Sequence, residues 1–174
     1  LLTIRKQGID MTAKFTVLGN TTLATSSASV TFSSIPSGYK DLVLVVDATT
    51  ATTWAAVYFQ VNNDTGNNYS MVRMSGDGSG ATSGTATNTG QFFGYGNDSY
   101  IGTAEGYLMT SEFSDYSATD KHKTVLTRVN NAARPAVDAM AQRWASTSAI
   151  TSIRVYLSND SYAAGSTFRL LGVN

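Results

Sequence analysis

The chain has 174 residues, of which 42% are hydrophobic and 14% are charged, and its 12 basic residues balance its 12 acidic ones. A chain of this length buries about 70% of its unfolded surface as one domain, and the balanced charge argues against the basic patch typical of nucleic-acid-binding proteins. The lack of cysteine excludes disulfides and thiolate metal sites.

The start of the chain suggests an N-terminal arm ahead of a single domain. Met11 begins a plausible start, so residues 1–10 are an extended start, a processed end or an ordered arm. We assign residues 1–12 to the arm and residues 13–174 to the domain. The longest apolar run, residues 42–46, is far shorter than the about 20 residues that span a bilayer, and we expect no signal peptide at the start of the chain. We expect no membrane partner and folding in a reducing cytoplasm.

Short apolar clusters, separated by Ser, Thr, Gly, Ala and Asn, follow along the chain. This composition is typical of strands joined by turns. The alternation predicts strands over residues 14–18, 22–32, 40–49, 54–62, 69–74, 91–95, 106–115, 123–129, 136–144, 151–157 and 166–173. We therefore predict an all-β fold, an antiparallel β-sandwich of jelly-roll type with about eight to ten short strands.

Three of these segments carry particular expectations. Residues 40–47 are almost continuously apolar, which predicts a central strand covered on both faces. Residues 151–157 alternate, so their apolar side chains should enter the core. Residues 136–144 also fit a helical pattern, in which Val137, Met140, Ala141 and Trp144 recur at helical spacing. We favour a strand there, because so short an apolar face suits a helix poorly and the neighbouring segments are β.

Residues 75–90, SGDGSGATSGTATNTG, contain five glycines and no large apolar side chain. Such a segment cannot contribute to a core. The sequence therefore predicts a long, flexible, exposed loop that either moves freely or is ordered by a neighbouring molecule.

No catalytic constellation is recognisable. His122 is the single histidine and lies in a polar run, so a solvated turn is the simplest interpretation. Glycoside hydrolysis needs two carboxylates across a cleft, and the candidates are Glu105, Glu112 and Asp115. Glu112 and Asp115 fall on opposite faces of an extended segment. We expect no catalytic residue and no cofactor.

Residues 62–68, NNDTGNN, supply oxygen ligands around a glycine, of the kind that calcium prefers. Asn62, Asp64 and Asn68 are the candidate ligands. The segment has one carboxylate and lacks the closing glutamate of an EF-hand, and Asn and Asp are also the residues that reverse a chain between strands. A hairpin turn is therefore the favoured interpretation, and calcium the weaker one.

Aromatic residues gather between positions 92 and 107, interleaved with glycine. Adjacent residues of a strand point to opposite faces, so Phe92 and Phe93 cannot both enter one core. Such mixtures line sugar-binding grooves and subunit contacts. We take Phe92, Phe93, Tyr95 and Tyr100 as the candidate interaction surface.

Four segments carry a resemblance to known proteins. They are FSSIPSGYKDL (residues 32–42), NNDTGNNYS (62–70), WASTSAITSI (144–153) and AAGSTF (163–168). Together, and in this order, they resemble small virion proteins of tailed phages. The resemblance implies a β-sandwich or jelly-roll part of a phage head or tail rather than an enzyme, and it brings no catalytic residues.

The resemblance and the neutral composition predict a capsid decoration or cement protein on the virion surface. It would act as a homotrimer and bind the major capsid protein, with residues 1–12 and 75–90 reaching neighbouring subunits. The alternative is a receptor-binding or carbohydrate-binding module of a tail fibre, in which Tyr95 and Tyr100 stack on a host glycan. An enzyme is the third possibility and would need carboxylates that converge only in space.

Overall fold

A computed structural model describes residues 14–96, 99–104 and 106–174. The expected arm, residues 1–12, and Glu105 lie outside the described residues. All regular elements of the described chain are strands, which confirms the all-β prediction. Among them is no helix long and apolar enough to cross a membrane.

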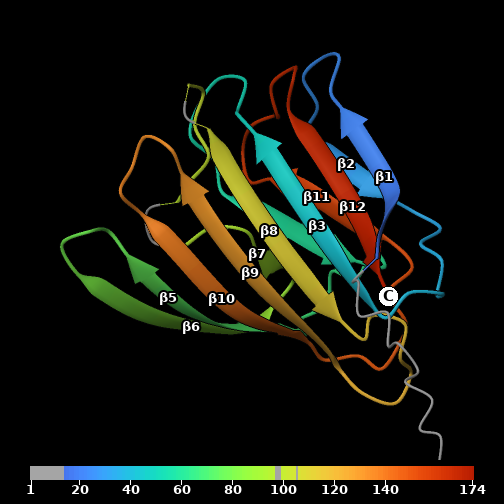
Figure 1. Cartoon of the computed structure of the whole chain (residues 1–174). Coiled ribbons are helices and arrows are strands. Elements are labelled where there is room, and N and C mark those ends of the chain that lie inside the picture. Colours follow the sequence, from blue (N-terminus) through green and yellow to red (C-terminus); the bar gives the residue numbers. More distant parts are fainter. Residues whose placement is uncertain (1–13, 97–98, 105) are drawn as a thin grey trace, which may run out of the picture.

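Twelve strands form two antiparallel sheets packed face to face (Figure 1). The eight-stranded sheet contains β1 (Phe15–Thr22), β12 (Thr167–Val173), β3 (Asp41–Ala48), β8 (Tyr107–Ser114), β9 (Lys123–Asn131), β10 (Val137–Trp144), β5 (Tyr69–Gly76) and β6 (Ala81–Thr89), in this spatial order. The four-stranded sheet contains β2 (Ser29–Phe32), β11 (Ile153–Leu157), β4 (Val57–Val61) and β7 (Phe92–Phe93).

The connections follow a jelly-roll plan. Four strands of the large sheet, in the order β1-β12-β3-β8, face the small sheet, in the order β2-β11-β4-β7. The chain passes from one sheet to the other between β1, β2, β3 and β4, and β11 and β12 return to lie between the N-terminal strands. Two added hairpins, β5-β6 and β9-β10, pair with each other through β5 and β10 and widen the large sheet.

The core lies between the sheets and is filled by alternate residues of most strands, whereas β1 and β6 contain no fully buried residue. In β9 every second side chain from Lys123 to Asn131 is buried, and β8 alternates in the same way. Ile153, Val155 and Leu157 of β11 point inward, as predicted. An aromatic cluster joins the two layers, since the Phe59 ring centroid lies 5.0 Å from that of Phe92 and 5.9 Å from that of Phe113.

The segment predicted as a flexible loop, residues 75–90, is instead mostly strand. β5 continues to Gly76 and β6 begins at Ala81, so only the turn between them is irregular. β6 is an edge strand with largely exposed side chains. A strand in that place needs backbone hydrogen bonds to one neighbour but no apolar face, and for this reason the composition of the segment misled the prediction.

One further prediction is confirmed and two change in detail. Residues 136–144 do form a strand, β10, and the helical pattern plays no part. The strand expected over residues 22–32 is confined to β2, while the first strand extends to Thr22. β3 is central, as expected, but only one face is covered: Leu42, Leu44 and Val46 are buried, whereas Val43 and Val45 remain partly exposed on the outer face of the large sheet.

Candidate functional site

Exposed apolar side chains concentrate on the outer face of the eight-stranded sheet. Among the described residues eight large hydrophobic side chains are exposed, and seven of them lie on this face. They are Phe15, Val17, Val72, Met74, Leu108, Leu126 and Val137, each between 44% and 65% exposed. Single exposed hydrophobics are normal on any protein, but their collection on one face makes that face a candidate interaction surface.

Strand register explains how residues far apart in sequence meet here. Val17, Leu171, Val43, Glu112, Leu126, Ala141 and Val72 lie opposite one another on successive strands from β1 to β5. Side chains in such a row stand on the same face, about 5 Å apart. The row is apolar except at Glu112 of β8, so an apolar stripe with one acidic residue in its middle crosses the sheet.

The stripe is hollowed where β10 carries small side chains. Ala139 lies between Arg128 of β9 and Met74 of β5, and Ala141 lies between Leu126 and Val72 on the same two strands. The taller neighbours form two walls above the alanines. The resulting apolar groove has a volume of about 590 Å³. It is lined by Phe15, Val43, Val72, Met74, Thr110, Glu112, Leu126, Thr127, Arg128, Ala139, Met140 and Ala141.

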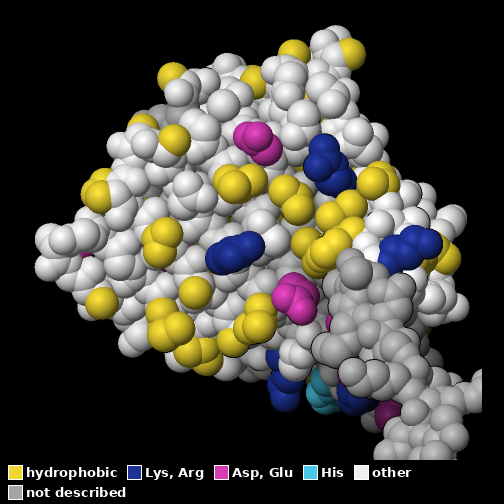
Figure 2. Space-filling model, in the orientation of Figure 1, with side chains coloured by type: hydrophobic (Ala, Val, Ile, Leu, Met, Phe, Trp, Pro, Cys, Tyr) yellow, Lys and Arg dark blue, Asp and Glu magenta, His cyan; other side chains and the backbone are white. Residues whose placement is uncertain are grey.

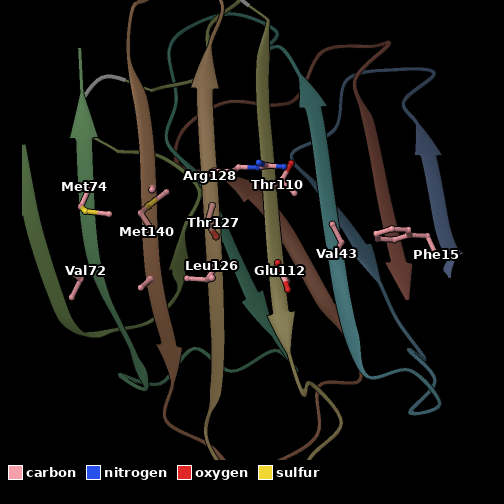
Figure 3. Close-up of a pocket in the computed structure, with 12 residues that line it drawn as sticks. Phe15, Val43, Val72, Met74, Thr110, Glu112, Leu126, Thr127, Arg128 and Met140 are labelled. Atoms are coloured by element: carbon pink, nitrogen blue, oxygen red, sulfur yellow. The ribbon is translucent and has the colours of Figure 1, made fainter. Parts of the chain in front are cut away.

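Figure 2 shows hydrophobic side chains distributed across this face, with basic and acidic side chains between some of them, and Figure 3 shows the lining side chains on separate neighbouring strands. The charged lining residues are Glu112 of β8 and Arg128 of β9. Among the lining residues Glu112 is the sole carboxylate, so the groove does not supply the pair of acids that glycoside hydrolysis requires. Its chemistry suits binding of an apolar surface with one acidic and one basic contact.

The second candidate surface is aromatic and lies on the opposite side of the sandwich. Phe92, one of the four residues predicted to be there, is wholly buried between Phe59 and Tyr69, so its assignment to a surface was wrong. Phe93, the next residue, points the other way and is partly exposed. The two neighbouring rings therefore point to opposite faces, as expected for a strand, and only Phe93 lies at the surface.

Phe93, Tyr95 and Tyr100 do come together, as predicted, with two tyrosines that the sequence interpretation missed. The ring centroid of Tyr58 on β4 lies 5.7 Å from that of Phe93, 5.6 Å from that of Tyr95 and 5.7 Å from that of Tyr156 on β11. The ring centroids of Tyr95 and Tyr100 are 4.8 Å apart. All five are partly buried, and they are called the aromatic surface below. The sequence did contain a signal for Tyr58 and Tyr156: each alternates with the inward-pointing apolar residues of its strand, which places its side chain on the outer face of the small sheet.

A shallow hollow of about 370 Å³ continues this surface beyond Tyr100. Its walls include Trp54, the one exposed large hydrophobic side chain of the described residues that is not on the large sheet. The guanidinium carbon of Arg134 lies 4.2 Å from the centre of the Trp54 ring. Ser158 and Asn159 add polar groups, and Ala55 and Ala56 are also part of the lining. We refer to it as the Trp54 hollow.

The candidate calcium ligands are engaged in fixing the turn after β4. The Asp64 carboxylate accepts hydrogen bonds from the Trp144 indole N–H (2.6 Å), Asn68 Nδ2 (2.9 Å) and the Gly66 backbone N–H (2.8 Å). Burial raises the pKa of Asp64, but these three hydrogen bonds outweigh it and hold the pKa below its usual value. Asn62 Oδ1 accepts from the backbone N–H groups of residues 151 and 152. These oxygens already have donors, as a structural turn requires.

His122 is exposed in the turn before β9. The neighbouring Lys121 forms an ion pair with Asp115 at 3.1 Å. No cluster of three or more metal-ligating residues occurs among residues 14–96, 99–104 and 106–174.

Searches against protein-family models, curated proteins and solved structures gave no match to this chain. The fold alone defines the class of protein: it is an antiparallel β-sandwich in which one sheet is enlarged to eight strands.

Proposed function

We propose that this chain is a non-enzymatic structural protein of a phage virion, a capsid decoration or cement protein that stabilises the head lattice. The observation that carries the proposal is the collection of seven of eight exposed large hydrophobic side chains on one face of one sheet. The resemblance of four sequence segments to small virion proteins of tailed phages supplies the biological setting.

The composition of β3 supports burial of this face in an assembly. Its sequence is almost continuously apolar, which is typical of a strand covered on both faces, yet the chain itself covers only one face of β3. Val43 and Val45 belong to the other side. Fully burying an apolar side chain of this size contributes about 1.5–3 kcal/mol. A partner on the apolar groove therefore gains a large favourable term from the side chains that surround it.

The shape of the groove favours a different protein over a second copy as its occupant. A two-fold dimer would use the same patch of both copies and so set one hollow against another. A projecting apolar segment fills the hollow better. We assign this role to the major capsid protein, and we place self-association into a trimer elsewhere on the molecule.

Decoration of this kind works by mass action. A protein that binds the assembled lattice and not its dissociated subunits stabilises the lattice by the free energy of binding. No bond is made or broken. The protein is then located on the outer surface of the head after folding in the host cytoplasm.

The test is co-sedimentation of the purified chain with expanded, empty heads of the phage that encodes it. Leu126→Glu places a charge in the centre of the apolar groove and should weaken binding by about a hundredfold or more, because an unpaired charge at a closed interface costs several kcal/mol. Thr31→Glu, an exposed site on β2 of the other sheet, is the matched control and should bind like the parent chain.

Equal binding of Leu126→Glu and the parent would show that the groove is not the contact. Binding to purified tails but not to heads would overturn the assignment to the head. Light scattering of the chain in solution tests the trimer separately, and a monomer at all concentrations would contradict that part of the proposal.

A second candidate function, a receptor-binding or carbohydrate-binding module of a tail fibre, is favoured by the aromatic surface on the small sheet. The two candidates use opposite sides of the sandwich. They are separated by whether the groove variant or an aromatic variant abolishes attachment to the phage's target.

A further inference from the structure

We infer that the Trp54 hollow is a binding site for a saccharide of a cell-surface glycan. The inference rests on this hollow and the adjoining aromatic surface, and it does not depend on the head-lattice proposal. The hollow is the place where an exposed tryptophan, a partly exposed tyrosine, an arginine and an amide face the same space.

Aromatic rings are the first requirement of a saccharide site. One face of a pyranose ring carries aliphatic C–H groups, which pack on the face or edge of an indole or phenol ring. Trp54 is 39% exposed and Tyr100 lines the same hollow. From Tyr100 the aromatic surface continues through Tyr95 to Tyr58, with ring centroids 4.8 and 5.6 Å apart. Further units of an oligosaccharide therefore find more aromatic rings next to Tyr100.

Polar groups at the rim are the second requirement, because sugar hydroxyls need donors and acceptors. Asn159 Oδ1 accepts a hydrogen bond from the Ser158 hydroxyl at 2.8 Å, which orients the amide and turns its N–H₂ group away from that contact. The planar guanidinium of Arg134 lies over one face of the Trp54 ring, 4.2 Å from its centre, so a sugar packs on the other face or on the edge of the ring. Among the lining residues there is no carboxylate, so neutral and acidic sugars are both admissible.

The site is held in place before any ligand arrives. Asp160 accepts hydrogen bonds from the backbone N–H of Thr53 (2.8 Å), the residue just before Trp54. Ala55, the residue just after, is paired with Ile101 by two backbone hydrogen bonds of 3.1 and 3.2 Å. These contacts fix the chain on both sides of Trp54.

Asn131 fixes the opposite wall. Its side-chain amide donates to the Tyr100 carbonyl at 2.7 Å, and its backbone carbonyl accepts from the Arg134 N–H at 3.3 Å. Asn131 itself is buried, with 2% of its surface exposed. One buried residue thus sets the spacing between Tyr100 and Arg134, and a preorganised site of this kind loses little entropy on binding.

A saccharide suits the hollow better than a protein segment. The hollow is shallow and its floor contains small residues, Ala55 and Ala56, beneath polar rim groups. A protein contact would gain most from the wide apolar groove on the other sheet, whereas a sugar gains from rings and fixed hydrogen-bonding groups together.

The experiment uses three hexasaccharides as probes: maltohexaose, chitohexaose and hexagalacturonate. Saturation-transfer NMR reports which sugar protons contact the protein, and tryptophan fluorescence follows binding. Trp54 is the responsive tryptophan, since Trp144 is 3% exposed. We expect at least one probe to bind with a Kd of about 1 mM or tighter, a range typical of weak contacts. Trp54→Ala should weaken that binding by at least about tenfold, as expected when a central aromatic contact is lost.

Leu126→Ser, in the apolar groove, is the matched control and should bind the sugars like the parent chain. Arg134→Gln distinguishes the sugar classes: a larger loss for hexagalacturonate than for the neutral probes marks an acidic glycan, and an equal loss marks a neutral one. Lack of binding of all three probes at about 10 mM, a concentration well above weak-site Kd values, would overturn the inference. Equal binding by Trp54→Ala and the parent would overturn it as well.

Discussion

Gln142 of β10 holds the backbone of Phe93 through both ends of its side-chain amide. Its Oε1 accepts from the Phe93 N–H at 2.8 Å, and its Nε2 donates to the Phe93 carbonyl at 2.9 Å. Gln142 belongs to the large sheet and Phe93 to the short strand β7 of the small sheet. One buried amide therefore joins the two layers and presents the Phe93 ring to the aromatic surface.

Replacing Gln142 should strongly destabilise the fold. Gln142→Leu leaves the buried N–H and carbonyl of Phe93 without their partner, at about 1–3 kcal/mol for each group. We expect a loss of about 2–4 kcal/mol in the free energy of unfolding, measured by urea denaturation. Arg143→Gln, on the exposed face of the same strand, should stay within about 0.5 kcal/mol. Equal stability of Gln142→Leu and the parent would show that the two hydrogen bonds between Gln142 and Phe93 are not needed for stability.

Two wholly buried tyrosines should respond oppositely to loss of the hydroxyl. The Tyr107 hydroxyl donates to the Gly94 carbonyl, whereas the Tyr162 hydroxyl forms no hydrogen bond with any described residue. Tyr107→Phe should cost about 1–3 kcal/mol, because the Gly94 carbonyl loses its donor. Tyr162→Phe should be neutral or stabilising, because it removes a polar group buried at a cost. Thermal and urea unfolding of the pair decide this, and a larger loss for Tyr162→Phe would refute it.

Alkaline pH should unfold the protein through the same residues. Burial raises the pKa of both Tyr107 and Tyr162 well above the ordinary value of 10.0. The unfolded chain then releases these protons first, so stability is full below about pH 10 and falls as pH rises, by about 1.4 kcal/mol per pH unit for each such tyrosine. Unfolding free energies between pH 9 and 12, compared for the parent and Tyr162→Phe, should show a shallower fall for the variant.

The Asp64 turn should give the protein an acid-sensitive stability. The pKa of Asp64 is lowered below 3.8 in the folded chain, so its contribution is present above that value and is lost as pH falls through the folded pKa. Asp64→Asn must turn an N–H₂ group toward at least one of three donors. We expect a loss of about 1.5–3 kcal/mol at neutral pH, the size of a hydrogen bond to a charged group.

Asp47→Asn, an exposed position of β3, is the control for Asp64→Asn. The difference in unfolding free energy between Asp64→Asn and the parent should shrink below about pH 3.8, where the parent carboxylate becomes protonated. A rise in melting temperature on adding calcium, abolished by Asp64→Asn, would instead restore the metal-binding interpretation.

The β5-β6 hairpin should depend on one glycine in its turn. Gly78 has φ = 84°, in the left-handed region, whereas Gly80 has no such strain and no neighbour within 4 Å of an added Cβ. Gly78→Ala should cost about 1 kcal/mol locally. Hydrogen exchange of the β6 amides should then speed up by about fivefold, since β6 is an edge strand. Gly80→Ala is the matched control, and equal exchange in the two variants would contradict the expectation.

Much of the fold follows from local pattern. Alternation with period two placed β8, β9, β11 and β12 close to their observed bounds, because each of these strands has one buried face. The same rule failed for β6, which lies at an edge and needs no apolar face. It succeeded only in part at Phe92 and Phe93, where parity shows that the rings diverge but not which one enters the core.

Neither candidate site could be assembled completely from the sequence, because strand pairing brings its residues together. The aromatic surface was found through Phe93, Tyr95 and Tyr100, which are close in sequence, while Tyr58 and Tyr156 join it only by strand pairing. The apolar groove escaped the sequence interpretation altogether. Its walls and floor come from strands as distant as β1 and β10, and the residues that line it are ordinary Val, Leu, Met and Ala.

The sequence by itself determined the class of fold, the orientation of most side chains and the lack of cysteine chemistry, because these depend on composition and on the period of a single strand. Only the tertiary structure decided which strands are neighbours, and hence that one outer face collects the exposed hydrophobics while the opposite face collects the aromatic rings. Strand order follows from long-range hydrogen bonding and packing between whole sheets, which no local pattern encodes.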